Sequence, residues 1–251
     1  MALDILGGIG KALELIFTGD PELYGIVSRS LLFSGMAIVL ATLWGTPIAM
    51  LISLREFRGK SLVKTFFNSM IGIPTVVLGL LLFLAFSNGG PLGFLGLLFT
   101  PGGIIIGEAI LVTPIIISIA TTAIEAVDPD IMNLARTLGA SESQASIAVL
   151  KEAVNGVLLS NVASFNRAIA ELGVALLVGG NIAGLTDVLT TAISRYTARA
   201  EIPYAIALGI LLMVLVFLIN LAVLLARKAK WILTIRKFPQ WLKRHRLEAE
   251  R

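Results

Sequence analysis

Long runs without a charged residue alternate with short polar segments along this chain. Residues 30–54 carry no charge and end at a basic cluster. Residues 65–107 are also uncharged, but this run is too long for one helix, and Ser87-Asn88-Gly89-Gly90-Pro91 is typical of a break. Because a helix needs about 20 apolar residues to cross a bilayer, we predict five spans, at 30–54, 66–86, 103–124, 156–180 and 202–226.

Composition supports an all-α, polytopic membrane protein. Of the 251 residues, 57% are hydrophobic and 14% are charged, too few charges to cover a soluble protein of this length. The net charge of +4 would suggest nucleic acid as a partner of a soluble domain, but here the basic residues fall in loops and at the C-terminus. The lipid bilayer, and no nucleic acid, is therefore the expected environment.

The distribution of Lys and Arg predicts the orientation. Four follow the first span, two follow the third and nine lie in the tail at 227–251. By the positive-inside rule these segments are cytoplasmic, so the N-terminus is outside and the C-terminus is in the cytoplasm. We expect one domain over 1–251, with an amphipathic interfacial helix at 1–19, a five-helix core at 28–226 and a basic cytoplasmic tail at 227–251.

Arg167 and Glu171 stand four residues apart inside an otherwise apolar segment. On a continuous helix this spacing places both on one face, within reach of each other. An ionised side chain at the bilayer centre costs about 2.5 to 3.5 kcal/mol on insertion scales, so such residues usually face a partner or an aqueous path. Two interpretations stay open: the pair holds helices together, or it helps to move an ion.

The polar segment at 128–148 is the second notable feature. Its start, Asp128-Pro129-Asp130, suits a helix cap, and Gly139 in its middle allows a turn. We predict a short cytoplasmic helix-turn-helix on the membrane surface. The alternative is an ordinary interfacial loop.

Residues 133–141, Asn-Leu-Ala-Arg-Thr-Leu-Gly-Ala-Ser, resemble the cytoplasmic coupling motif of ABC-importer permeases. Ala135, Gly139 and Val149 match that motif, whereas Asn133 and Leu134 depart from its Glu-Ala start and Lys151-Glu152 replaces its Leu-Pro end. The stretches at 72–81, 90–101 and 167–182 also resemble such a permease. They are most similar to the tungstate-uptake branch of the molybdate, tungstate and sulfate group.

This resemblance implies a subunit of the prokaryotic cell membrane that acts as a homodimer. Two cytoplasmic ATP-binding subunits would drive alternating access, and an external binding protein would deliver an oxyanion, most readily tungstate. The residues that would contact the ATPase are Asn133, Ala135, Arg136, Gly139 and Ala140. The alternatives are a molybdate or sulfate permease of the same group, or an ATP-independent anion channel.

A tetrahedral oxyanion is best held by backbone N–H groups, hydroxyls and amides, with little net positive charge so that it can leave again. We therefore expect a pathway that involves Arg167, Glu171, Asn181, Ser164 and Thr113. The alternative for each hydroxyl is a hydrogen bond to its own helix. Gly103 and Gly107 have the spacing that lets helices pack closely, and Pro47, Pro74 and Pro114 are expected to kink their helices.

An enzyme is not expected. The single histidine, His245, lies in the basic tail, and no Asp falls within a predicted span, so neither a metal site nor a pair of catalytic aspartates is expected. Gly59-Lys60-Ser61 imitates the end of a phosphate-binding loop, but Leu54 occupies the position of its first glycine. No cofactor is expected, and ATP hydrolysis is assigned to a separate subunit.

Overall fold

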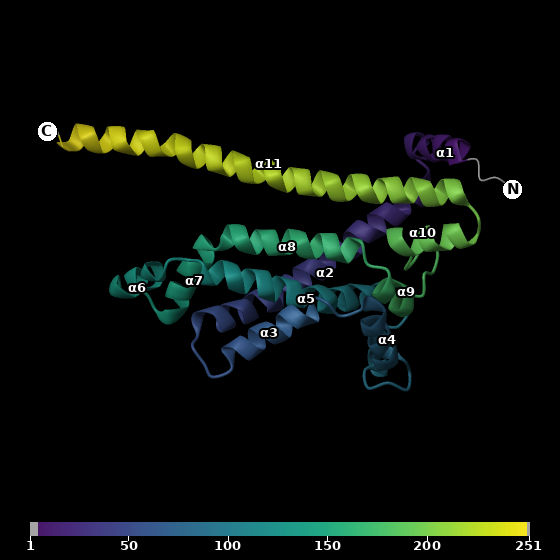
Figure 1. Cartoon of the computed structure of the whole chain (residues 1–251), viewed down its shortest axis with the longest axis horizontal. Coiled ribbons are helices and arrows are strands. Elements are labelled where there is room, and N and C mark those ends of the chain that lie inside the picture. Colours follow the sequence, from purple (N-terminus) through teal and green to yellow (C-terminus); the bar gives the residue numbers. More distant parts are fainter. Residues whose placement is uncertain (1–4, 250–251) are drawn as a thin grey trace. The chain divides into compact units, whose positions relative to one another are not determined.

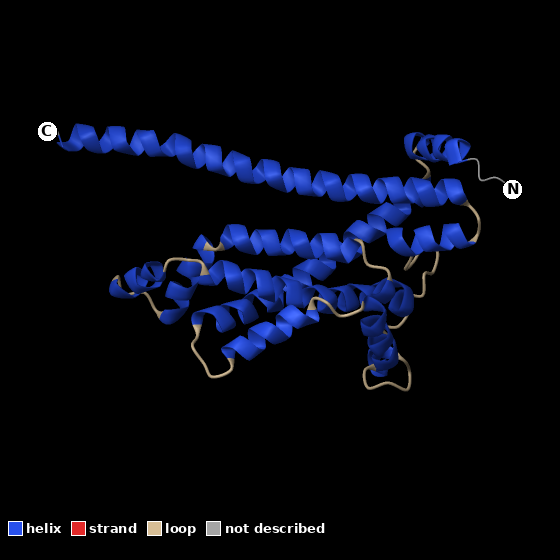
Figure 2. Cartoon of the chain, in the orientation of Figure 1, coloured by secondary structure: helices blue, strands red, loops and turns tan. Residues whose placement is uncertain are grey.

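The computed structural model describes residues 5–249, and the side chains of residues 7–225. These residues form helices joined by loops, with no strand among them (Figure 2). The chain divides into two units, Met1–Leu212 and Met213–Arg251. The second unit consists of the later part of the last helix. The elements are α1 Ile5–Thr18, α2 Pro21–Leu54, α3 Lys60–Met70, α4 Thr75–Phe86, η1 Gly93–Leu95, α5 Pro101–Glu125, α6 Pro129–Thr137, α7 Glu142–Glu152, α8 Val154–Ile169, α9 Gly173–Gly179, α10 Leu189–Ala198 and α11 Ile202–Ala249.

Helix α5 is the centre of the first unit. It packs against α2, α3 and α8, and Figure 1 shows α8 and α3 on opposite sides of it. The core between α2 and α5 is built from small and β-branched residues, including Ala37, Ala41, Ile104 and Ile116, all fully buried. Because α5 is apolar around most of its circumference, it lies inside the bundle, whereas α4 exposes a broad apolar face.

Three helices are long and apolar enough to cross a membrane: α2, α5 and residues 202–225 of α11. Two bent pairs, α3 with α4 and α7 with α8, bring the number to five if each pair is one span. The expected span at 66–86 is therefore not one helix. It is broken by a bend of 96° next to Pro74, which has no backbone N–H to continue α3.

The expected span at 156–180 was also wrong as a single helix. Helix α8 ends at Ile169, and the short helix α9 begins at Gly173. The expected loop after residue 180 contains a further helix, α10. At the start of the chain, α2 begins at Pro21 rather than residue 30, because the Asp20 carboxylate accepts a hydrogen bond from the Leu23 amide and caps the helix.

Two short helices, α6 and α7, form a helix-turn-helix in the expected segment. Asp128 caps α6, and Ser141 and Gln144 form a capping box at the start of α7. Gly139 between them has φ +85°, which favours glycine. Helix α1 lies within residues 1–19; its Ala12 is buried, and its Phe17 is 84% exposed.

Glycines allow α9 to pack closely against its neighbours. A Cβ atom on Gly79 of α4 would lie 2.9 Å from the carbonyl oxygen of Gly173, and one on Gly173 would lie 2.8 Å from the amide nitrogen of Val76. A Cβ atom on Gly107 of α5 would lie 2.6 Å from a methyl group of Val174. The close packing expected at Gly107 is thus confirmed, and α9 is wedged between α4 and α5.

We predict that Gly79→Ala destabilises the α4–α9 contact. The new methyl group would meet backbone that cannot move aside cheaply, so unfolding should require about 1 to 3 kcal/mol less free energy. Gly209→Ala is the matched control, because a Cβ atom there meets nothing within 4 Å. Thermal unfolding of the purified protein in detergent should show a lower Tm for Gly79→Ala only. Equal midpoints would contradict the close approach.

Candidate functional site

Arg167 and Glu171 form an ion pair at the break between α8 and α9. The distance from Arg167 Nη1 to Glu171 Oε2 is 2.6 Å. The predicted contact at spacing i, i+4 is present, but the two residues do not share a continuous helix. Arg167 lies in the last turn of α8, and Glu171 follows the end of that helix.

The Glu171 carboxylate also caps α9. Its Oε1 atom accepts hydrogen bonds from the amides of Gly173, at 2.7 Å, and Val174, at 3.2 Å. Its backbone carbonyl accepts a hydrogen bond from the Thr190 hydroxyl of α10. Glu171 therefore satisfies backbone groups that the helix break would otherwise leave without partners, and it joins α8, α9 and α10.

Exposure distinguishes the two members of the pair. The Glu171 side chain is 1% exposed, whereas that of Arg167 is 36% exposed. The carboxylate is fixed by three donors, and the guanidinium reaches from it toward the surface of the unit. An anion near this break would meet the positive group first, with its charge partly offset by Glu171.

The other predicted pathway residues have different surroundings. The Thr113 hydroxyl accepts a hydrogen bond from Trp44 Nε1 at 2.7 Å and donates to the Ala109 carbonyl, so it joins α5 to α2. Ser164 is fully buried, and its hydroxyl has no partner among the described residues. Asn181 adopts φ +51° after α9 and donates to the Thr191 carbonyl at 3.1 Å. Within the described part of the chain, none of these three hydrogen-bonds with Arg167 or Glu171.

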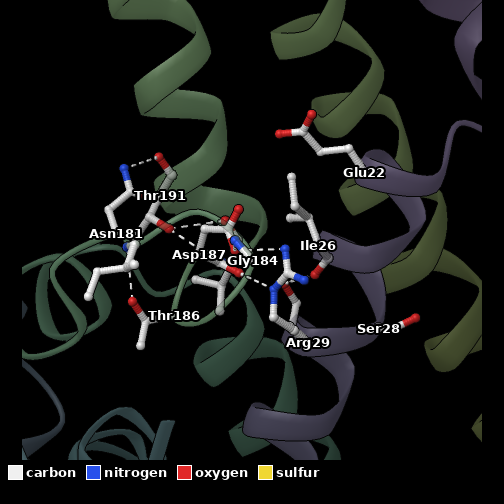
Figure 3. A network of polar contacts seen from close by, with 12 residues as sticks. Glu22, Ile26, Ser28, Arg29, Asn181, Gly184, Thr186, Asp187 and Thr191 are labelled. Carbon is white, nitrogen blue, oxygen red and sulfur yellow. Dashed lines mark hydrogen bonds and ion pairs between the residues drawn. The ribbon is translucent and has the colours of Figure 1, made fainter. Parts of the chain in front are cut away.

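A buried polar network lies between α2 and the loop that joins α9 to α10 (Figure 3). Asp187 is fully buried at its centre. Its Oδ1 atom lies 2.7 Å from Arg29 Nη2 and accepts a hydrogen bond from the Gly184 amide, and its Oδ2 atom lies 3.0 Å from Arg195 Nη2. One carboxylate thus holds two guanidinium groups from different helices.

Neighbouring contacts complete this network. The Leu189 amide at the start of α10 donates to the Ser30 hydroxyl of α2 at 2.7 Å. Thr186 is also buried, and its hydroxyl donates to the Gly179 carbonyl and accepts from the Ile182 amide. The loop is consequently fixed against α2, and it fixes the position of α10, whose Thr190 holds Glu171.

The helix-turn-helix of α6 and α7 presents a mixed surface. Asn133, Arg136 and Gly139 are exposed, and Ala135 and Ala140 are partly buried. Arg136 donates two hydrogen bonds to the Glu142 carboxylate, at 2.9 and 2.8 Å, which raises the pKa of the guanidinium. Leu134 and Leu138 are 60% and 79% exposed. Two large exposed apolar side chains therefore lie just before the turn at Gly139, as in a surface that meets another protein.

No group of three or more carboxylate or imidazole side chains that could hold a metal ion occurs within the described residues. The chemistry that this geometry offers is instead electrostatic: a partly exposed guanidinium beside a fixed carboxylate, within a bundle of membrane-spanning length.

Comparison with known proteins identifies the family. Residues 37–230 match the model described as the inner membrane component of binding-protein-dependent transport systems. The chain belongs to this family. It is 35% identical to the tungstate uptake system permease protein TupB of Peptoclostridium acidaminophilum, over 86% of this chain and 95% of the relative. It is 36% identical to TupB of Campylobacter jejuni, over 86% of this chain and 90% of the relative.

A solved structure of the same fold supports this conclusion. The inward-facing MetNI methionine ABC transporter matches with a TM-score of 0.69 and 18% identity, over 84% of this chain and 98% of that chain. This protein is therefore the membrane-spanning permease subunit of an ABC importer, as the resemblance of its motifs implied. It is a transport component.

Sequence reasoning missed the network around Asp187 in this permease. Asp187 lies between the predicted spans at 156–180 and 202–226, yet it is buried with its partner Arg29, which stands 158 residues earlier. No short-range spacing signals such a pair. Glu108, which falls within the predicted span at 103–124, is likewise buried, at 1% exposure.

We predict that Asp187→Asn strongly destabilises the permease. The neutral amide would leave the guanidinium groups of Arg29 and Arg195, which are 22% and 9% exposed, without the buried carboxylate that they share, and removing one member of a buried pair costs about 3 kcal/mol or more. The matched control is Glu201→Gln, an exposed carboxylate near the end of α10, which should change stability by less than about 0.5 kcal/mol. Thermal unfolding in detergent measures both, and an unchanged Tm in Asp187→Asn would show that the network contributes nothing.

Proposed function

We propose that this permease imports tungstate as a homodimer, together with two cytoplasmic ATP-binding subunits and an external binding protein. The observation that carries the proposal is the similarity to permeases of tungstate uptake systems from two organisms, over nearly their whole length. Molybdate and sulfate are the alternative cargoes, because they share the shape and charge of tungstate. In this proposal ATP hydrolysis occurs on the partner subunits, and this chain provides the pathway.

We propose five spans, with the N-terminus outside. The excess of Lys and Arg after the first span, after the third span and in the tail supports this orientation. The structure offers a consistent arrangement at that end of the bundle. Lys60 and Lys64 lie in α3 and belong to the basic cluster that follows the first span. Their Nζ atoms lie 3.4 and 2.6 Å from the carboxylate oxygens of Glu125, at the end of α5 and shortly before α6. The basic loop and the α6–α7 pair thus belong to one end of the molecule, which we assign to the cytoplasm.

Arg167 is the group that we assign to the passing anion. Its guanidinium is partly exposed, and a positive charge lowers the barrier that a divalent anion meets in a medium of low dielectric constant. Glu171 is assigned a positioning role: it holds the guanidinium and offsets part of its charge, so that the anion is attracted without being trapped. The Ser164 hydroxyl has no partner among the residues that the structure describes, so it has a proton that it can donate to an oxyanion.

Asn181 and Thr113 remain in the proposed pathway in supporting roles. Asn181 already donates to the Thr191 carbonyl, so it shapes the end of α9 rather than offering a free donor. Thr113 already receives the Trp44 indole N–H, so it sets the distance between α2 and α5. The proposal consequently depends on Arg167 first and on Ser164 second.

Arg167→Gln should slow ATP-dependent tungstate uptake by about tenfold or more, since about 1.4 kcal/mol added to the barrier already suffices for that factor. The measurement uses the complete complex in proteoliposomes, with binding protein and tungstate outside and ATP enclosed inside, so that transport runs into the vesicle. Glu171→Gln should slow release, so that the cargo is held longer, while it keeps an oxygen to cap α9.

Arg199→Gln is the matched control, because it removes one positive charge from an exposed position outside the proposed pathway. It should transport at the wild-type rate. If Arg167→Gln also transports normally and only the Tm of the complex falls, the pair is structural. If wild-type complex imports molybdate or sulfate in preference to tungstate, the assigned cargo is wrong, whatever the variants do.

We propose that the turn between α6 and α7 docks into the ATP-binding subunit, through the residues Asn133, Ala135, Arg136, Gly139 and Ala140. The exposed leucines beside the turn support this role, because Leu134 and Leu138 would be covered by a partner. The motif resemblance of residues 133–141 supports it independently.

Gly139→Trp should abolish substrate-stimulated ATP hydrolysis in the complex while the permease still folds. A side chain at Gly139 meets nothing within 4 Å inside this chain, so its bulk would act on the partner. Gly19→Trp is the matched control, since Gly19 also has positive φ, at +75°, and also has open space around it, but lies in the turn between α1 and α2. Equal ATPase rates in both variants would reject the docking role.

A further inference from the structure

A pocket of about 510 Å³ lies between the last turns of α2 and the α6–α7 pair. Neither the ion pair at Arg167 nor the network at Asp187 contributes to it. It is lined on one side by residues of a membrane span and on the other by residues of two short, polar helices. It is thus placed where a bilayer and an aqueous phase meet.

The two walls differ in chemistry. Helix α2 contributes Pro47, Met50, Leu51 and Leu54, an apolar strip at the end of a span. Helix α7 contributes the hydroxyl of Ser143, and Ser146, whose hydroxyl already donates to the Glu142 carbonyl at 2.8 Å. An occupant that satisfies both walls needs an apolar part beside α2 and a hydrogen-bond acceptor beside α7, which is the construction of an amphiphile.

Charge determines the sign of the polar part. Two arginines line the pocket, Arg55 just after α2 and Arg136 of α6. The Arg136 guanidinium is held in two hydrogen bonds by Glu142. Arg55 forms no ion pair with any residue that the structure describes. The pocket therefore contains a positive charge that its own walls leave without a counter-ion, and an anionic group fits beside it.

We infer that this pocket binds one anionic phospholipid, with its phosphate at Arg55, the Ser143 hydroxyl near its headgroup, and an acyl chain along Leu51 and Pro47. Basic pockets beside spans on the cytoplasmic side are sites where anionic headgroups bind. The volume exceeds what an inorganic phosphate requires, and the apolar strip would stay uncovered by such an ion. The orientation proposed above assigns this end of the bundle to the cytoplasm, so the lipid comes from the cytoplasmic leaflet.

Such a lipid would connect a membrane span to the helices that we assign to ATPase docking. It would lie against α2 on one side and against α6 and α7 on the other. The anionic lipid would then be a structural component of the end of the bundle that contains α6 and α7, as well as part of the surrounding membrane.

The test measures lipid binding to the purified complex, depleted of lipid and then titrated with dioleoylphosphatidylglycerol, by native mass spectrometry. Arg55→Gln should weaken binding of this lipid about fivefold, the effect of one basic residue near an anionic surface. Arg58→Gln is the matched control, because Arg58 carries the same charge in the same loop but does not line the pocket. It should change the affinity by less than about twofold.

A second pair of variants keeps the test independent of charge. Leu54→Trp fills the pocket and should reduce bound phosphatidylglycerol, whereas Leu62→Trp, at an exposed position of α3 outside the pocket, should not. Phosphatidylcholine should bind more weakly than phosphatidylglycerol, and soluble glycerol 3-phosphate should fail to displace the lipid.

Equal losses in Arg55→Gln and Arg58→Gln would overturn the inference, since they would indicate diffuse surface charge. Equal binding of phosphatidylcholine, or displacement by glycerol 3-phosphate, would overturn it as well, the latter in favour of a simple anion site. The readout is binding and not transport. A permease that fails to import tungstate can therefore still pass this test, and the two proposals fail separately.

Discussion

The fold depends on partners that the protein itself provides, without help from water. Its buried charged side chains need ion-pair partners, and the backbone amides and carbonyls at helix interruptions need hydrogen-bond partners. A span interrupted between α8 and α10 leaves amides and carbonyls that lipid cannot hydrogen-bond. Two buried carboxylates meet this need. Glu171 caps α9 and pairs with Arg167, and Asp187 accepts from the Gly184 amide and pairs with Arg29 and Arg195. Thr190 connects the two, because it lies on the helix that Asp187 positions and donates to the Glu171 carbonyl.

The opposite end of the bundle is held differently. Lys64 with Glu125, and Arg136 with Glu142, are ion pairs with substantial exposure, and such pairs contribute about 0 to 1 kcal/mol each. The end with the α6–α7 pair can therefore rearrange at lower free-energy cost than the end with the buried network. Alternating access in an importer requires that some contacts change while others hold, and this uneven distribution of polar contacts is suited to that requirement.

Sequence reasoning found the features that depend on local composition. It missed the features that depend on where a helix bends or ends, and on contacts between residues far apart in the sequence. Hydropathy located α2 and α5, because a run without charges is visible in any window. Pro74 was expected to kink the second span, but hydropathy did not show that this span divides into two helices, because the residues on both sides of the bend are uncharged. It also did not show the end of α8 at Ile169. Arg167 and Glu171 were found through a spacing of four residues. Asp187 and Arg29 were not, because their contact exists only after folding.

The same distinction explains why Arg167 is the residue on which the transport proposal rests. Arg29 contacts Asp187 through both Nη2 and Nε, so its role is to stabilise the bundle. Arg167 instead has a partner that is locked by backbone amides, while its own side chain stays partly exposed. An unpartnered positive charge would bind a divalent anion too tightly to release it. A charge offset by a fixed carboxylate attracts the anion across the apolar interior and lets it leave, which is what a conducting site must do.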